Sequence, residues 1–90
     1  MYSKTVYIGN PSGLHARPAT DFVTCAKKFS SRITICESGS EEQAVNAKSI
    51  VSLLTLSLTQ GKQAVITAKG SDEKEAVDAL AALIEDNFSG

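Results

Sequence analysis

The 90-residue sequence is short of several residues on which particular classes of protein depend. It has no tryptophan, two prolines, two cysteines and a single histidine, His15. Cys25 and Cys36 are separated by ten residues, and there is no further cysteine and no second histidine to complete a metal-binding set. Neither a zinc site nor a CxxC redox pair is therefore predicted. We interpret both cysteines as free thiols, buried or half-buried.

The chain has almost no net charge and no long apolar run. Nine Lys and Arg balance ten Asp and Glu, which gives a net charge of −1. A nucleic-acid binder needs a basic surface to displace counterions from phosphates, so no nucleic-acid partner is expected. The longest uncharged run, residues 49–61, contains Ser, Thr and Gln and is shorter than the about 20 apolar residues that span a bilayer. Residues 1–10 lack the pattern of a signal peptide, so we expect a cytoplasmic protein without membrane insertion.

What is present is the composition of one small globular domain over residues 1–90. Hydrophobic residues make up 42% and charged residues 21%, and no linker or repeat divides the chain. Alternation of apolar residues predicts strands, whereas spacing at i, i+3, i+4 predicts amphipathic helices. Ser49 is the expected N-cap of the second helix, with Gly61 just beyond its end. Asp72, followed three residues later by Glu75, resembles a capping box for the third helix, whose apolar stripe extends to Phe88. The expected strands are residues 1–8, 32–37, 43–46 and 63–68, and the expected helices are 16–28, 49–58 and 72–88.

These elements predict a two-layer architecture. Each of the three helices has one apolar stripe to bury, and a four-stranded, mostly antiparallel sheet has one face to offer. We therefore expect an α+β fold, an open-faced two-layer sandwich with three helices on one face of the sheet and the order β-α-β-β-α-β-α. The other face of the sheet is expected to face water.

The segment Ser12 to Ala19 has the most informative chemistry. His15 stands at or just before the N-cap of the first predicted helix. The first backbone N–H groups of a helix lack internal partners and lie at the positive end of its dipole, so they form an anion site. Pro18 falls in the first turn, where its missing N–H breaks no helical bond, and the donors of Ala16 and Arg17 stay available to a ligand.

His15 in this position suits nucleophilic attack on a phosphoryl group. The helix N-terminus and Arg17 both disfavour a second positive charge, so the imidazole is expected to be neutral and nucleophilic near pH 7. The charge added by a phosphoryl group would then fall beside Arg17 and the free N–H groups. Two alternatives remain at this point: His15 as a cap or surface residue, and Arg17 as a solvated charge.

The motif Gly13-Leu14-His15-Ala16-Arg17-Pro18-Ala19 resembles the active-site signature of the HPr family, the histidine-containing phosphocarriers of the bacterial phosphotransferase system. The resemblance extends through the order of elements. It implies that His15 accepts a phosphoryl group on Nδ1 from phosphorylated Enzyme I and passes it to IIA domains of sugar permeases. Arg17 would pair with the phosphoryl oxygens, with Ser12 within reach, and the protein would be a carrier completed by its partners rather than a stand-alone enzyme. No metal or other cofactor is implied.

The second predicted helix has more apolar positions than one buried stripe needs. Ile50, Val51 and Leu54 are candidates for a partner interface, with burial of all three in the core as the alternative. Lys48-Ser49-Ile50 also resembles the regulatory site at which HPr kinase/phosphorylase modifies HPr proteins of many Gram-positive bacteria. A phosphate there would add about −1.5 to −2 charges to this surface. A plain N-cap is the alternative role for Ser49.

Other functions remain open from the sequence. One is a regulatory protein of catabolite repression, whose output through a transcription factor depends on Ser49. Another is a carrier in a nitrogen-related branch of the relay. A small hydrolase of the acylphosphatase kind would need Arg and Asn arranged around a water, and no such loop is evident.

Overall fold

Four strands form one antiparallel sheet in the computed structural model, which describes residues 1–88. The first and last strands lie side by side, because Tyr2 pairs with Ala68 and Tyr7 with Gln63. Each neighbouring pair of strands is antiparallel. The strands are β1 (Tyr2–Tyr7), β2 (Arg32–Glu37), β3 (Val45–Asn46) and β4 (Gln63–Lys69), and their order in the sheet is β1-β4-β2-β3.

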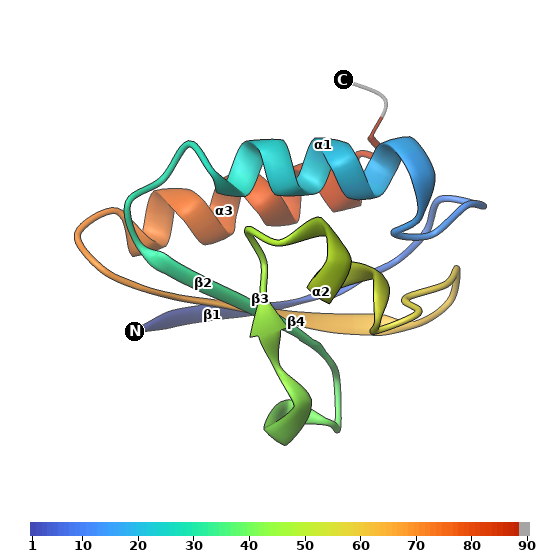
Figure 1. Ribbon diagram of the computed structural model, residues 1–90, viewed down its shortest axis with the longest axis horizontal. Helices are drawn as coiled ribbons and strands as arrows, with labels where there is room; N and C mark the ends of the chain where they lie inside the picture. Colours follow the sequence, from blue (N-terminus) through green and yellow to red (C-terminus); the bar gives the residue numbers. More distant parts are fainter. Residues whose placement is uncertain (89–90) are drawn as a thin grey trace.

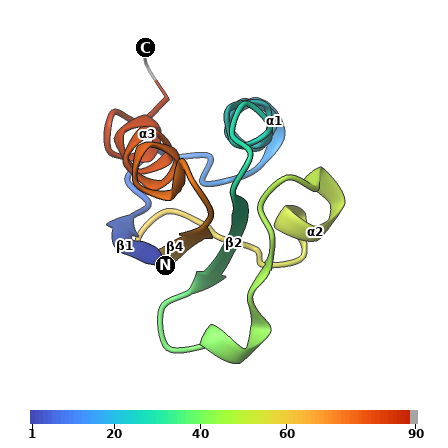
Figure 2. The ribbon, with the colours of Figure 1, turned by 90° about the vertical axis from the view of Figure 1, so that its left-hand side faces the viewer.

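Three helices lie on one face of this sheet (Figure 1): α1 (Ala16–Ala26), α2 (Ile50–Leu54) and α3 (Glu73–Glu85). Figure 2 shows α1 and α3 side by side over the sheet, with the short α2 below α1 and beside β2. The expected open-faced sandwich of order β-α-β-β-α-β-α is confirmed. Within residues 1–88, no helix combines the length and the apolarity that crossing a membrane requires.

The core lies between the helices and the sheet. Both long helices bury the stripe that their periodicity predicts, and the strands bury the alternate side chains that face them. Phe22 of α1 is fully enclosed and is the largest of these side chains. The core residues that the two long helices and the strands contribute are Ala19, Phe22, Val23 and Ala26 of α1, Ala76, Val77, Leu80, Ala81 and Ile84 of α3, and Val6, Ile33, Ile35, Ala64, Ile66 and Ala68 of the strands.

The second helix is shorter than its sequence suggests. Ser49 caps it as predicted, since its Oγ accepts a hydrogen bond from Ser52 N at 3.3 Å. However, α2 ends at Leu54, four residues before the expected end. After Leu54 the backbone bonds tighten to the carbonyl three residues back, as from Leu56 N to Leu53 O at 3.1 Å, and Ser57 then leaves the helical region with a φ of +50°. Leu58 is buried nonetheless and reaches the core from the loop that follows.

The predicted capping box of the third helix is wrong. Asp72 is the N-cap residue of α3 but makes no side-chain cap. Its carboxylate instead accepts hydrogen bonds from Ser30 N and Ser31 N, both at 2.9 Å, and from Ser31 Oγ. These bonds, led by the one from the Ser31 hydroxyl, lower the pKa of Asp72 from 3.8 to about 2. They attach the start of α3 to the turn between α1 and β2.

Three element boundaries also differ from the sequence prediction. α1 ends at Ala26, so Lys27 and Lys28 lie just past its last turn. α3 ends at Glu85, and Phe88 is half-buried beyond it with a φ of +57°. The third strand has only two residues, because Glu41–Gln43 form a 3₁₀ turn, η1, that packs against β2.

The outer face of the sheet is less open than expected. Cys36 of β2 lies next to the inward-facing Ile35 and pairs with Val65, yet it is buried. The segment that contains η1 hangs beneath this face in Figure 1. Cys25 and Cys36 are both free thiols, and burial is the main cause that raises the pKa of each.

Candidate functional site

The loop between β1 and α1 is fixed by backbone contacts with a distant part of the chain. Leu14 N donates to Leu58 O at 2.8 Å, Ile8 N donates to Lys62 O at 2.9 Å, and Gly61 N donates to Ile8 O at 2.8 Å. The side chains of Ile8 and Leu14 are buried in the core. His15 therefore directly follows a residue whose position is held by the core.

Gly13 is required by this docking. Its φ is +63°, and a Cβ at this position would lie 2.4 Å from Leu58 O and 2.8 Å from the Cα of Thr59. Any other residue would combine an unfavourable backbone conformation with a steric clash. The glycine of the sequence motif thus allows the loop to approach the segment after α2 closely.

His15 occupies the N-cap of α1 in an extended conformation, with φ of −131° and ψ of 163°. Its side chain is half-buried and makes no cap hydrogen bond, so the imidazole does not serve as a helix cap. The first turn of α1 contains no acidic residue that would occupy or neutralise the helix N-terminus. An imidazole beside unoccupied helix donors is a suitable attachment point for an anionic group.

Ala16 carries backbone strain directly after the histidine. Its φ is +54°, in the left-handed region that non-glycine residues avoid at a cost of roughly 1–2 kcal/mol. Strained residues of this kind concentrate at functional sites, where the surrounding structure holds them in place. The periodicity of the sequence gives no sign of this conformation.

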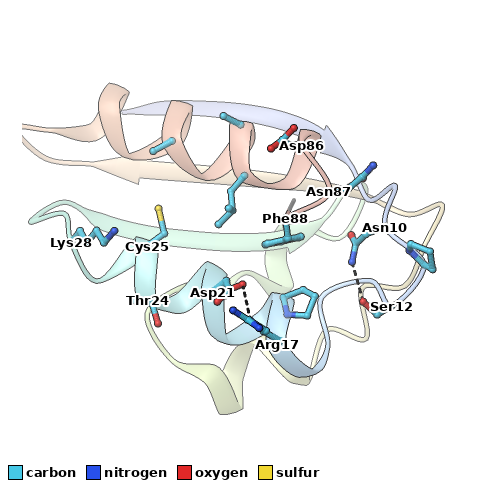
Figure 3. Close-up of a pocket in the computed structure, with 15 residues that line it drawn as sticks. Asn10, Ser12, Arg17, Asp21, Thr24, Cys25, Lys28, Asp86, Asn87 and Phe88 are labelled. Atoms are coloured by element: carbon cyan, nitrogen blue, oxygen red, sulfur yellow. Dashed lines mark hydrogen bonds and ion pairs between the residues drawn. The ribbon is translucent and has the colours of Figure 1, made fainter. Parts of the chain in front are cut away.

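Arg17 is free to move toward an anion. Its side chain is 91% exposed, and its Nε forms an ion pair with Asp21 Oδ2 at 3.9 Å, one turn further along α1. An exposed pair of this length contributes little stability, so losing it costs little. Figure 3 shows Arg17 and Asp21 on the α1 side of a groove between α1 and the end of α3, with Ser12 on the neighbouring loop and Lys28 further along α1.

An exposed apolar patch lies on α2. Ile50, Val51 and Leu54 are 37%, 72% and 39% exposed, whereas Leu53 is buried beneath them. The alternative that all three side chains belong to the core is therefore wrong. Ser49 immediately precedes this patch.

Asn10 is a residue of this site that the sequence interpretation missed. It is 4% exposed, and its Nδ2 donates to Gly13 O at 2.8 Å and to Ser12 Oγ at 3.2 Å. The signal was the segment Asn10-Pro11-Ser12-Gly13, because asparagine side chains favour bonds to the backbone within tight turns. Within residues 1–88, no cluster of three or more His, Cys, Asp or Glu side chains is placed to hold a metal ion.

Comparison with known proteins agrees with this geometry. The family model for the PTS HPr component phosphorylation site matches residues 2–86. Phosphocarrier protein HPr from Haemophilus influenzae is 51% identical over 84 residues, which cover 93% of this chain and 95% of that protein. The multiphosphoryl transfer protein of the same organism is 41% identical over 84% of this chain, which corresponds to 15% of that larger protein.

A solved structure of HPr-C-His from Thermoanaerobacter tengcongensis superimposes with a TM-score of 0.92 at 44% identity, and the match covers 100% of this chain and 98% of that one. Fold and sequence together define the class of phosphoryl-carrying proteins. The chain belongs to the HPr family, the phosphocarriers of the bacterial phosphotransferase system.

Proposed function

We propose that His15 is the residue that carries the phosphoryl group, accepting it from phosphorylated Enzyme I and passing it to IIA domains of sugar permeases in the cytoplasm. The observation that carries this proposal is the half-buried imidazole at the N-cap of α1, which makes no cap bond and stands beside free helix donors. A carrier must hold its cargo without enclosing it, and a helix start at the surface meets that requirement.

Transfer needs only one bond to form and one to break. The lone pair of His15 Nδ1 attacks phosphorus, and the bond between phosphorus and the donor breaks with its electron pair left on the donor atom. The phosphoryl oxygens then face the N–H groups of Ala16 and Arg17, and the exposed guanidinium of Arg17 leaves Asp21 to pair with them. The second transfer repeats these steps in reverse, with a IIA domain as the acceptor.

The test is incubation with phosphoenolpyruvate and Enzyme I, followed by mass spectrometry of the intact protein. One acid-labile phosphate is expected, and it can fall only on His15 if it is a phosphohistidine, because the chain has one histidine. His15→Ala should take none while keeping the circular dichroism spectrum of the native protein. A protein that stays unlabelled, or a label that survives in this variant, would refute the proposal.

We also propose that the patch of Ile50, Val51 and Leu54 contacts both partners. Val51 projects furthest into solvent, and a charge there would have to be desolvated in any apolar interface. Val51→Asp should therefore lower the transfer rate at subsaturating Enzyme I by at least about tenfold, because the interface would have to bury an unpaired charge. Tyr7→Asp is the matched control, because Tyr7 is also exposed but lies in β1. Equal rates for the two variants would argue against the patch.

Ser49 is the proposed regulatory site on the same surface, modified by an HPr kinase/phosphorylase and read by a catabolite-control transcription factor. Its position directly before the patch supports this role, since a phosphate there would add about −1.5 to −2 charges where partners dock. Treatment with ATP and such a kinase should modify the native protein and Ser52→Ala but not Ser49→Ala, and should slow transfer to His15. An unmodified Ser49 would leave it as the N-cap that the structure contains.

A further inference from the structure

Asn10 stabilises the turn before His15 through both its main chain and its side chain. Its main-chain carbonyl accepts from Gly13 N at 3.0 Å, and its side-chain Nδ2 donates to Gly13 O at 2.8 Å. Both polar groups of the Gly13 backbone are thus bonded to one residue. The same Nδ2 donates its second hydrogen to Ser12 Oγ at 3.2 Å.

The orientation of this amide follows from its partners. Gly13 O can only accept, so the nitrogen of the Asn10 side chain must face it. The oxygen Oδ1 consequently points the other way, where it is buried without a hydrogen-bond donor within residues 1–88. Burying an unpaired acceptor lowers stability, and an alanine at this position would avoid that cost. The benefit of the asparagine must therefore lie in what its nitrogen holds.

Its effect on Ser12 concerns the direction of one hydrogen atom. A hydroxyl has one hydrogen and two lone pairs. Because Asn10 Nδ2 donates to Ser12 Oγ, a lone pair of that oxygen is occupied and the hydroxyl hydrogen must point elsewhere. Ser12 is exposed and lines the groove between α1 and α3, and it lies on the same short loop as His15. Figure 3 shows its hydrogen bond with Asn10.

We propose that Asn10 is a positioning residue, which orients the Ser12 hydroxyl to donate to a phosphoryl group on His15. The inference rests on the proposed function of His15. Asn10 itself stays buried and does not touch the phosphoryl group. The ligand that Ser12 meets is a phosphoryl oxygen, a negatively charged hydrogen-bond acceptor.

The test is a double-mutant cycle in the full chain, using phosphoenolpyruvate and Enzyme I. Asn10→Ala and Ser12→Ala should each slow phosphoryl transfer at saturating Enzyme I by about tenfold or more, the effect of losing one hydrogen bond to a charged acceptor. Because Asn10 acts through Ser12, the double variant should be no slower than Ser12→Ala alone. Asn46→Ala, an exposed asparagine of β3, is the matched control and should transfer at the native rate.

A second readout separates positioning from a loss of stability. The ³¹P resonance of phosphorylated His15 should shift in the same direction in Ser12→Ala and in Asn10→Leu, a variant that fills the buried space without donating a hydrogen bond. Asn46→Ala should leave the resonance in place. Urea unfolding of every variant shows which of them are folded. If Asn10→Ala does not fold, Asn10→Leu takes its place in the test.

The outcomes distinguish the inference from the function on which it rests. Two results would overturn the role of Asn10 and leave His15 as the carrier: Asn10 variants that transfer at the native rate, or a double variant in which the two single rate losses multiply. A native protein that takes no label would overturn both.

Discussion

Replacement of Gly13 by alanine tests how the site is attached to the rest of the fold. Two separate costs are expected. The φ of +63° disfavours any residue with a Cβ by roughly 1–2 kcal/mol. In addition, the new Cβ would lie 2.4 Å from Leu58 O, so the loop must move by about 1 Å to reach an ordinary contact of 3.4 Å. Overpacking of this kind costs about 1–3 kcal/mol.

The movement would also strain the bond from Leu14 N to Leu58 O, now 2.8 Å, which anchors the residue before His15. We expect Gly13→Ala to lower the free energy of unfolding by about 3 kcal/mol in urea titrations. Gly39→Ala is the matched control, since Gly39 has a φ of +93° with no atom within 4 Å of the new Cβ. Equal losses for the two variants would show that the contact with Leu58 does not limit the loop.

Three further predictions concern the site and its supports. Arg17→Ala should slow phosphoryl transfer about 10-fold to 100-fold without changing the urea midpoint, because it removes one charge-assisted bond worth about 1.5–3 kcal/mol; a native rate would contradict this. Ala16→Gly should raise the free energy of unfolding by about 1 kcal/mol, because glycine adopts the φ of +54° without strain. An unchanged urea midpoint would show that Ala16 is not strained. The pKa of Asp72 is lowered in the folded state from 3.8 to about 2, so its contribution to stability is present above pH 3.8 and is lost as the pH falls toward 2. Asp72→Asn should remove that part of the pH dependence of the urea midpoint. The same pH profile in the native protein and in Asp72→Asn would refute this role of Asp72.

The fold was predictable wherever local periodicity and burial agree. Phe22 and its neighbours on α1 are buried because a period of 3.6 residues places them on one face, and the alternation of Ile33 and Ile35 does the same for β2. The end of α2 was not predictable in this way. Leu58 continues the helical spacing, but Ser57 adopts a left-handed conformation, which the spacing of apolar residues does not encode.

In the candidate site too, the local features were predictable and the long-range ones were not. His15 and Arg17 follow from their positions at the start of a helix, a local feature of the sequence. The strain at Ala16 and the buried position of Asn10 depend on the docking of the loop onto residues 58–62, which only the folded chain brings together. Asp72 likewise resembles a helix cap in sequence, yet in the structure it bonds to Ser30 and Ser31, more than 40 residues away.

The sheet order gives this site a dependence on the timing of folding. β1 is an edge strand whose hydrogen-bonded neighbour is β4, and Tyr2 pairs with Ala68, 66 positions further along the chain. Contacts of such long sequence separation form late and slowly, because the intervening chain must first be closed into a loop. During synthesis, the ribosome produces His15 early, but its loop cannot dock until Leu58 and β4 have left the exit tunnel. The proposed site around His15 is therefore complete only after the last strand has paired.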